Sequence, residues 1–374
     1  MRVCCLLIFV VSVLLTGCSR GEPLPDEAGS SVSAPDSGAA ENDKKPPAEE
    51  SAPELVARAT SVKRDAGGLI TEVNFRGAEI DYGTLTHLSS LKGLRSLLLN
   101  DTAISDAGLQ TIGKLTTLHN LDLRGCAVSN EGLAHLVGLK NLRALRLSGS
   151  SGATTVDDAG MEYVAHLTNL KALALDFLWI SEEGLAKLAA LSNLEELYLA
   201  KTLVGDEALP VLKQFPMLRK LRISQTQVSS AALENLAALK NLEDLDLSEN
   251  SQIFDDGMTH LAALTSLKRL NLWRVAITDA GVKPLAGLTQ MEWLNLDNTQ
   301  VTDEALQYLH AMKHLAFLHL GSTAVTDAGL PQLEGLTALK ELQVTRTAVT
   351  EEGVAKLKQK LPDTKVQLKY LGNE

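Results

Sequence analysis

Two histidines and four pairs of acidic residues have spacings that could serve metal binding or acid–base chemistry. His310 and His314 are four residues apart, so on one helix they would face the same way and could chelate zinc. The helix expected there ends near Met312, however, and the sequence offers no third ligand. We therefore interpret these histidines as solvated surface residues and expect no metal site.

The acid pairs recur at one place in a regular pattern, where a helix is expected to begin. They are Asp157-Asp158, Glu182-Glu183, Asp255-Asp256 and Glu351-Glu352. Negative charge at the start of a helix is stabilised by the helix dipole, by about 0.3–1 kcal/mol for each residue. The pattern thus indicates helix capping rather than catalysis or calcium binding.

Motifs of known enzyme classes are missing from the sequence. It contains no GxSxG, no HExxH, no P-loop and no CxxC. The formal charge of -11 also argues against a nucleic-acid partner, because nucleic acid requires a basic face. We therefore expect a protein that is not an enzyme, has no cofactor and binds no nucleic acid.

Residues 1–17 have the outline of a secretory signal peptide. One positive charge, Arg2, precedes an apolar run that is shorter than the span of about 20 residues that a membrane requires. The letters LTGC at residues 15–18 resemble the bacterial lipobox. This resemblance implies cleavage before Cys18 and a lipid with acyl chains such as palmitate on its sulfur, which would anchor the protein to a membrane. The alternative is an ordinary signal peptide with a chance cysteine.

Residues 18–53 have a composition that is typical of a disordered tether. They are rich in Ser, Ala, Pro, Gly and acidic residues, and few of their side chains are aliphatic. We expect this segment to connect the lipid on Cys18 to the folded domain. The lipobox resemblance implies an extracytoplasmic location in the cell envelope, and Ser19 favours the outer membrane in a cell with two membranes.

From residue 69 onward the sequence repeats one phrase of about 24 residues. In its clearest copy, Leu318 and Leu320 are two apart, as on one face of a strand. Three later leucines, beginning at Leu330, are spaced by three and form the apolar stripe of a helix expected from about Ala328. The copies open at Leu94, Leu118, Leu142, Leu170, Leu194, Leu218, Leu242, Leu267, Met291, Leu315 and Leu339. Two of the intervals are longer than the others, which predicts insertions in loops.

The pattern LxxLxLxxTxVTDxGLxxLxxL resembles the leucine-rich repeat, in particular its cysteine-containing and GALA-like bacterial subtypes. The resemblance implies an α/β repeat solenoid, a horseshoe with a parallel β-sheet on its concave face and short helices on its convex face. About twelve repeats would occupy residues 69–360. We expect an N-terminal cap at residues 54–68, whose strand forms a hairpin with residues 70–75. Residues 361–374 would form a C-terminal cap strand and tail.

Six repeats carry a threonine shortly after the strand, and one repeat carries a cysteine instead. The threonines are Thr102, Thr202, Thr226, Thr299, Thr323 and Thr347. We expect their hydroxyls to bond to the backbone of the neighbouring turn. Cys126 takes the same place and is expected to act as a small buried hydrophobic residue rather than as a reactive thiol.

The strand positions beside the inward leucines should face the concave surface, so the large residues at these positions are the candidate binding residues. These are Tyr198, Arg222, Arg269, Asn271, Trp273, Trp293, Asn295, Phe317 and His319. Trp293 and Phe317 should be neighbours on adjacent strands, with Trp273 diagonal to Trp293, so that the three rings form one aromatic patch. Exposed aromatic residues and arginines dominate protein interfaces. The alternative is that these large side chains merely pack over the sheet.

Two further aromatic residues, Phe177 and Trp179, follow the strand of an earlier repeat. We expect them to pack into the loop there rather than to bind a partner. The four-residue insertion in residues 148–155 lies one repeat earlier and is a second, weaker candidate for a contact.

These observations favour a non-enzymatic, lipid-anchored, extracytoplasmic protein that mediates protein–protein interaction through its concave face. Its partner would be a protein or peptide of the cell envelope. Two alternatives stay open. One is a glycan- or peptidoglycan-binding envelope protein, because tryptophan with Asn, Asp and His also binds sugar rings. The other is a purely structural component of the envelope.

Overall fold

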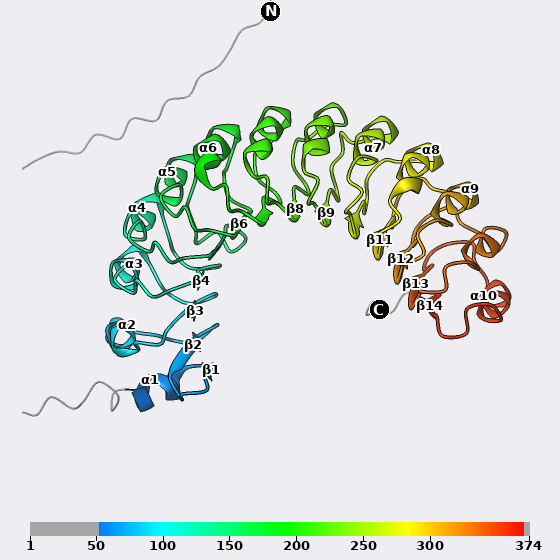
Figure 1. Ribbon diagram of the computed structural model, residues 1–374. Coiled ribbons are helices and arrows are strands. Elements are labelled where there is room, and N and C mark those ends of the chain that lie inside the picture. Colours follow the sequence, from blue (N-terminus) through cyan, green and yellow to red (C-terminus); the bar gives the residue numbers. More distant parts are fainter. Residues whose placement is uncertain (1–51, 370–374) are drawn as a thin grey trace, which may run out of the picture. The chain divides into compact units, whose positions relative to one another are not determined.

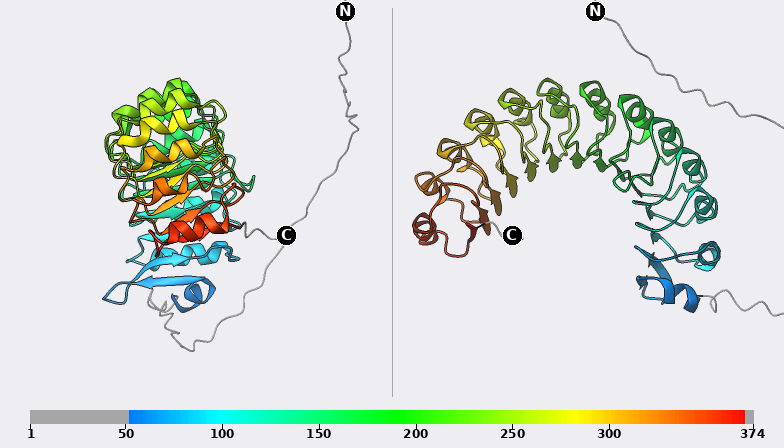
Figure 2. Two further views of the ribbon diagram at one scale, coloured as in Figure 1. Left: turned by 90° about the vertical axis from the view of Figure 1, so that its right-hand side faces the viewer. Right: turned by 180° about the vertical axis from the view of Figure 1, so that it is seen from behind.

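The computed structural model describes residues 52–369, in which one 14-stranded sheet runs through the whole solenoid (Figure 1). Neighbouring strands follow the order of the sequence from β1 to β14, and all pairs are parallel except the first. The strands line the inner side of an arc and the helical segments its outer side (Figures 1 and 2). The predicted horseshoe is therefore confirmed. The predicted signal peptide, Cys18 and the tether up to residue 51 lie outside the described residues, as do residues 370–374.

The strands are short, and most have three residues. They are β1 Ser61–Arg64, β2 Ile70–Asn74, β3 Ser96–Leu98, β4 Asn120–Asp122, β5 Ala144–Ser148, β6 Ala172–Asp176, β7 Glu196–Tyr198, β8 Lys220–Arg222, β9 Asp244–Asp246, β10 Arg269–Asn271, β11 Trp293–Asn295, β12 Phe317–His319, β13 Glu341–Gln343 and β14 Lys365–Gln367. Their inward residues supply the sheet side of the core.

The helical segments are α-helices in some repeats and 3₁₀ helices in others. The α-helices are α1 Ala52–Arg58, α2 Tyr82–His87, α3 Asp106–Ile112, α4 Asn130–Ala134, α5 Met161–Val164, α6 Glu182–Lys187, α7 Asp255–Leu261, α8 Asp279–Val282, α9 Asp303–Leu306 and α10 Glu351–Lys358. The 3₁₀ helices are η1 Leu88–Ser90, η2 Asp158–Gly160, η3 Leu188–Ala190, η4 Asp206–Gln214, η5 Ala231–Ala238, η6 Lys283–Gly287, η7 Gln307–Leu309 and η8 Leu330–Leu333. The helix predicted from Ala328 is thus a 3₁₀ helix that begins at Leu330. Pro331 lies at its start, where a missing N–H costs no helical hydrogen bond.

Leucines at fixed places in each turn form one continuous core. Leu318 in β12 and Leu320 after it are fully buried, as is Leu333 on the helical side of the same turn. Because the strands are in register, Leu318 pairs with Leu294 on one side and Leu342 on the other. One turn alone could not bury this surface, so stacking of the repeats is what stabilises the fold.

Both insertions leave the register of the sheet intact. Leu145 pairs with Leu173 across the longer insertion, and Leu245 pairs with Leu270 across the shorter one. The extra residues are accommodated in the loops after the strands, as the repeat intervals predicted.

Asn250 replaces the usual threonine in the repeat with the shorter insertion, and it is fully buried. Its side-chain N–H groups donate to the carbonyls of Ile223 at 2.8 Å and Leu247 at 3.0 Å. Its side-chain oxygen accepts from the amide of Thr226 at 2.8 Å. One side chain therefore satisfies polar backbone groups of two turns, which a threonine is too short to do.

The first acidic residue of many helices bonds to the next repeat, an arrangement that the sequence did not predict. The Oδ1 atom of Asp303 accepts from the Thr326 amide at 2.8 Å, and its Oδ2 accepts from the Thr326 hydroxyl at 2.7 Å. The equivalent pairs are Asp106–Ser129, Asp158–Ser181, Asp206–Ser229, Asp255–Thr278, Asp279–Thr302 and Asp327–Thr350. These carboxylates therefore link successive repeats in addition to interacting with the helix dipole.

A glycine accompanies this link, because the carboxylate approaches the backbone of the next helix closely. A Cβ atom at Gly329 would collide with Oδ1 of Asp303, and one at Gly353 would collide with Oδ1 of Asp327. The letters TDxG in the repeat thus encode one contact between neighbouring turns: the acid is on one turn, and the threonine and glycine are on the next.

The threonine after each strand bonds within its own turn, so the predicted bond to the neighbouring turn is wrong. Thr323 donates to the carbonyl of Leu320 at 2.6 Å, three residues before it, and the other five do the same. The backbone acceptor nearest to the hydroxyl is the carbonyl of its own tight turn, and the Thr226 hydroxyl reaches the next turn only at a side chain, Oδ1 of Asn250 at 3.1 Å. Cys126 is the exception, since its Sγ lies 3.1 Å from the carbonyl of Leu99 in the preceding turn. Cys126 is buried, and burial raises the pKa of its thiol.

Additional elements cover both ends of the described solenoid. At the N-terminal end, helix α1 precedes the β1–β2 hairpin, in which Val62 pairs with Val73. At the other end, β14 pairs in parallel with β13. Between residues 52 and 369, no helix is long and apolar enough to cross a membrane.

Candidate interaction surface on the concave sheet

The strands of the later repeats turn their first and third residues toward the concave side and bury the second. In β11, Leu294 is buried, whereas Trp293 and Asn295 are half-buried. In β12, Phe317 and His319 are half-buried in the same way. These candidate residues therefore point away from the leucine core, as expected, and whether they bind a partner stays a prediction.

Trp293 and Phe317 stack on each other on neighbouring strands. They are register partners, and their ring centres are 5.1 Å apart with 6° between the planes. The spacing follows from the sheet, because adjacent strands are about 4.8 Å apart. His319 meets Phe317 edge-on, with 6.3 Å between the ring centres. Burial lowers the pKa of His319.

Arg269 extends this row on the other side of Trp293. It pairs in register with Trp293, and its guanidinium carbon lies 4.5 Å from the centre of the indole. We call Arg269, Trp293 and Phe317 the aromatic stack. Cation–π contacts of this kind contribute about 0.5–1 kcal/mol at exposed sites, and stacked rings about 0.5–1.5 kcal/mol. The stack therefore has a defined conformation before any partner arrives.

Tyr198 on β7 and Arg222 on β8 form a similar cation–π pair earlier in the sheet. The guanidinium carbon of Arg222 lies 5.1 Å from the Tyr198 ring centre. Arg222 also contacts Asp176 at 3.2 Å and Asp246 at 3.5 Å, so it is held between two carboxylates. Burial and the hydrogen bond to Glu196 raise the pKa of Tyr198, and burial raises the pKa of Asp176. At neutral pH, Tyr198 therefore remains a neutral hydroxyl.

A hollow of about 240 Å³ lies between these two groups on the concave side. It is lined by Tyr198, Lys220, Leu221, Arg222, Asp244, Asp246, Arg269, Asn271 and Trp293. Five of the nine candidate binding residues thus border one hollow. The lining mixes charges of both signs with aromatic rings, and it contains no pair of groups arranged as nucleophile and base.

Trp273 does not belong to the aromatic stack, which corrects the predicted diagonal contact. Residues 269–271 of β10 pair with residues 293–295, so Trp273 lies beyond the paired segment and two positions further along than Asn271. Its ring is paired instead with Arg274, whose guanidinium carbon lies 5.3 Å from the ring centre. Periodicity alone places Trp273 and Trp293 on the same face of the sheet, but the strand register places them four positions apart along the strand direction.

Phe177 and Trp179 are exposed, so the prediction that they pack into the loop is wrong. Trp179 is 73% exposed and Phe177 39% exposed, with Lys201 4.9 Å from the Phe177 ring centre. The interior of the turn is already occupied by the alternate residues Leu178 and Ile180, which are both buried. Trp179 thus provides an exposed tryptophan outside the concave rows.

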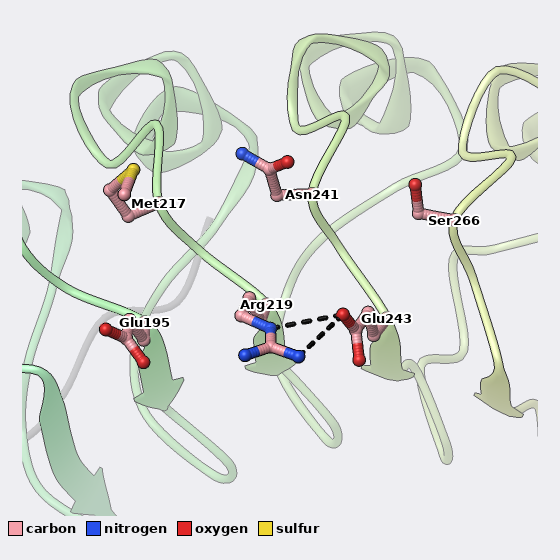
Figure 3. A pocket seen from close by; sticks show the side chains of 6 residues that line it. All are labelled: Glu195, Met217, Arg219, Asn241, Glu243 and Ser266. Atoms are coloured by element: carbon pink, nitrogen blue, oxygen red, sulfur yellow. Dashed lines mark hydrogen bonds and ion pairs between the residues drawn. The ribbon is translucent and has the colours of Figure 1, made fainter.

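A second hollow lies where the chain enters strands β7 to β10 (Figure 3). It has a volume of about 300 Å³ and is lined by Glu195, Met217, Arg219, Asn241, Glu243 and Ser266. Arg219 donates to Glu243 at 2.7 Å, and Glu195 pairs with Lys171 at 2.5 Å. The repeat pattern did not predict this hollow, although the charge of the residue before successive strands alternates in sign from Lys171 to Glu243. Each of its charged residues already has an ion-pair partner, Glu195 with Lys171 outside the hollow and Arg219 with Glu243 inside it.

The residues first considered for metal chemistry stay apart. His310 and His314 are exposed, and the Nδ1 atom of His310 lies 2.7 Å from the carbonyl oxygen of Gln307. Across residues 52–369, no group of three or more His, Cys, Asp or Glu side chains is placed to hold a metal ion. The acid pairs lie at helix starts, and two of their members, Asp158 and Asp255, also form the links between repeats described above.

Comparison with known proteins agrees with this architecture. The family model for the leucine-rich repeat region matches residues 75–352, and no curated protein matches the sequence. Among solved structures, an internalin from Listeria monocytogenes aligns over 81% of this chain and 87% of its own, with 21% identity and a TM-score of 0.58. A plant peptide hormone receptor in complex with RGF2 aligns over 83% and 60%, with 16% identity and a TM-score of 0.46. A leucine-rich repeat protein of Leptospira interrogans aligns over 75% and 86%, with 19% identity and a TM-score of 0.43. The internalin shares the fold, and since the family model covers more than half of the chain, this protein belongs to the leucine-rich repeat family.

Proposed function

We propose that this protein binds a protein or peptide partner through its concave sheet, without catalysis, while a lipid on Cys18 holds it at the cell envelope. The observation that carries the proposal is the aromatic stack beside an open hollow. Tryptophan, tyrosine and arginine are the residues that most often dominate binding energy at protein interfaces. Here they are held by a rigid sheet, so little conformational entropy is lost when a partner binds.

The arrangement of the stack favours a protein partner over a glycan. A sugar ring that stacks on tryptophan needs a free face of the indole. Arg269 and Phe317 lie on the strands on either side of Trp293, and each is close to its ring. Both faces of Trp293 are therefore taken, and its edge is left for contact with flat or extended protein surfaces.

The hollow argues for recognition rather than a purely structural role. A sheet that served only as a spacer would not need half-buried tryptophan, tyrosine and arginine around an unfilled hollow. Small or charged residues would cover such a sheet and would make non-specific association with other proteins less favourable. The early concave positions Ala144, Ala172 and Ala174 are small in this way. The aromatic candidates Tyr198, Trp293 and Phe317 all lie on strands after β6, which supports placing the proposed contact there.

Capture of partners from native membranes tests the concave surface. We expect Trp293→Ala to reduce the amount of specifically captured protein at least tenfold, whereas Trp179→Ala should leave it unchanged. The second variant removes a tryptophan of greater exposure from outside the concave rows and is thus the matched control. If Trp179→Ala alone reduced the amount of captured protein, the contact would lie at Trp179 and not on the concave sheet. If Trp293→Ala instead abolished retention of the protein on peptidoglycan, the glycan alternative would be supported.

The lipid anchor is tested separately from binding. The proposal predicts that Cys18→Ala, or treatment with globomycin, blocks incorporation of a labelled fatty acid and releases the protein from the membrane fraction. A Cys126→Ala variant should remain lipidated, because that thiol is buried in the repeat core. Unchanged membrane fractionation of Cys18→Ala would show that the lipobox assignment is wrong.

A further inference from the structure

Arg269 has hydrogen-bond donors that the described residues leave unused. Its Nε lies 3.4 Å from a carboxylate oxygen of Asp244, and its guanidinium lies over Trp293. The structure shows no hydrogen bond from its terminal nitrogens to any residue within 52–369. These nitrogens carry most of the N–H donors of an arginine, and a guanidinium held over a ring can still donate to a group beside that ring.

The other two cations of the 240 Å³ hollow are already neutralised more closely. Lys220 pairs with Glu196 at 2.7 Å. Arg222 contacts Asp176 at 3.2 Å through a terminal nitrogen and Asp246 at 3.5 Å through Nε. Arg269 is therefore the cation of this hollow with the most capacity to bind a ligand.

An anionic ligand is favoured at Arg269 itself rather than by the net charge of the hollow. Glu196 and Asp176 already pair with Lys220 and Arg222, whereas the terminal nitrogens of Arg269 have no hydrogen-bond partner among the described residues. A carboxylate matches the two terminal nitrogens of a guanidinium geometrically and forms two parallel hydrogen bonds with them. The rest of the row, Trp293 and Phe317, offers apolar ring edges directly beside Arg269.

The spacing of the row restricts how a ligand can use both features. Adjacent strands are about 4.8 Å apart, so Trp293 lies about 5 Å and Phe317 about 10 Å from Arg269 along the row. In an extended peptide, side chains two positions apart point the same way and are separated by about 6.6 Å. A carboxylate at Arg269 and an apolar side chain between the two ring edges match that separation.

We infer that the partner presents an extended segment in which an Asp or Glu binds Arg269 and an apolar residue two positions away packs on Trp293 and Phe317. This inference rests on the proposed function and gives its partner a chemical signature. The acid displaces water from Arg269 without needing to break the pairs of Lys220 and Arg222. The segment runs across the strands, along the row that begins at Arg269.

Selection of peptides from a random displayed library on the purified full chain tests this signature. We expect the selected peptides to be enriched in an acid two positions from an apolar residue. A synthetic peptide with that pattern should bind Arg269→Gln at least tenfold more weakly than the native chain, and Arg269→Lys should recover only part of the loss because lysine cannot bind a carboxylate in the bidentate way. Arg274→Gln is the matched control, since Arg274 also lies over a tryptophan but is paired with Glu249 at 2.9 Å.

Replacing the acid of the peptide by its amide completes a double-mutant cycle with Arg269→Gln. If the two groups interact, the amide peptide should bind the native chain and Arg269→Gln equally. If the binding of selected peptides required Trp293 but the peptides contained no conserved acid, or if they bound Arg269→Gln as tightly as the native chain, the inference would be wrong and the proposed function would still stand. Peptides that depend on Trp179 and not on Trp293 would overturn both.

Discussion

The link between Asp303 and Thr326 can be tested by removing the carboxylate with Asp303→Ala. Both oxygens of Asp303 accept hydrogen bonds from Thr326 in the next repeat, at 2.8 Å and 2.7 Å. Glu304, the next residue, is exposed and provides the matched control, because it is also an acid in the first turn of α9. The structure assigns the Glu304 carboxylate no partner among the described residues.

The two variants should differ in their effect on the free energy of unfolding. Hydrogen bonds to a charged group contribute about 1.5–3 kcal/mol each, and because Asp303 is only half-buried its two bonds are taken at the low end, together about 3 kcal/mol at most. We therefore expect Asp303→Ala to lower the free energy of unfolding by about 2–3 kcal/mol. Glu304→Ala removes only the interaction with the helix dipole, about 0.3–1 kcal/mol.

Urea unfolding followed by circular dichroism measures the difference. The midpoint of Asp303→Ala should fall clearly below that of Glu304→Ala, with the slope of the transition unchanged. Equal shifts for the two variants would refute the link between repeats and would restore helix-dipole stabilisation as the whole role of the acids.

Three further predictions follow from the same contacts. Gly329→Ala should destabilise the native chain, because its Cβ meets Oδ1 of Asp303, and should cost less in the Asp303→Ala background; an unchanged cost measured by urea unfolding would argue against the collision. The Thr350 hydroxyl and amide lower the pKa of Asp327 from 3.8, so its stabilising effect is present above that value and is lost as the pH falls through the folded pKa; the unfolding midpoints of the native chain and Asp327→Asn should therefore differ at about pH 7 and converge only as the pH falls below 3.8. The thiol of Cys126 should react with a disulfide reagent only after unfolding, because burial raises its pKa, and rapid modification of the folded chain would contradict its place in the core.

The repeat period was sufficient to predict the solenoid, its sheet and the inward leucines. A spacing of two followed by a spacing of three specifies a strand and a helical segment, and eleven copies of it leave no other way to bury the leucines together. The neighbouring positions of Trp293 and Phe317 also follow, because repeats of equal length place equivalent residues side by side.

Interactions between repeats could not be predicted in the same way. The sequence shows that Asp303 precedes a helix, but not that its oxygens reach Thr326, since that depends on how closely successive turns pack. Periodicity predicts the face on which Trp273 lies but not its distance along a short strand, so it wrongly places Trp273 in the aromatic patch. It also cannot predict the exposure of Trp179, because that depends on the volume already filled by Ile180 and its neighbours.

A photo-reactive residue placed on each side of the solenoid would test most directly whether the concave sheet contacts the partner. Asn295 lies on the concave strand β11, and Gln332 is an exposed residue of η8 on the helical side. With p-benzoylphenylalanine at either position, irradiation of native membranes should give a discrete cross-linked protein from position 295 and none from position 332. Cross-links from position 332 alone would contradict the account, because the partner would then bind the convex side.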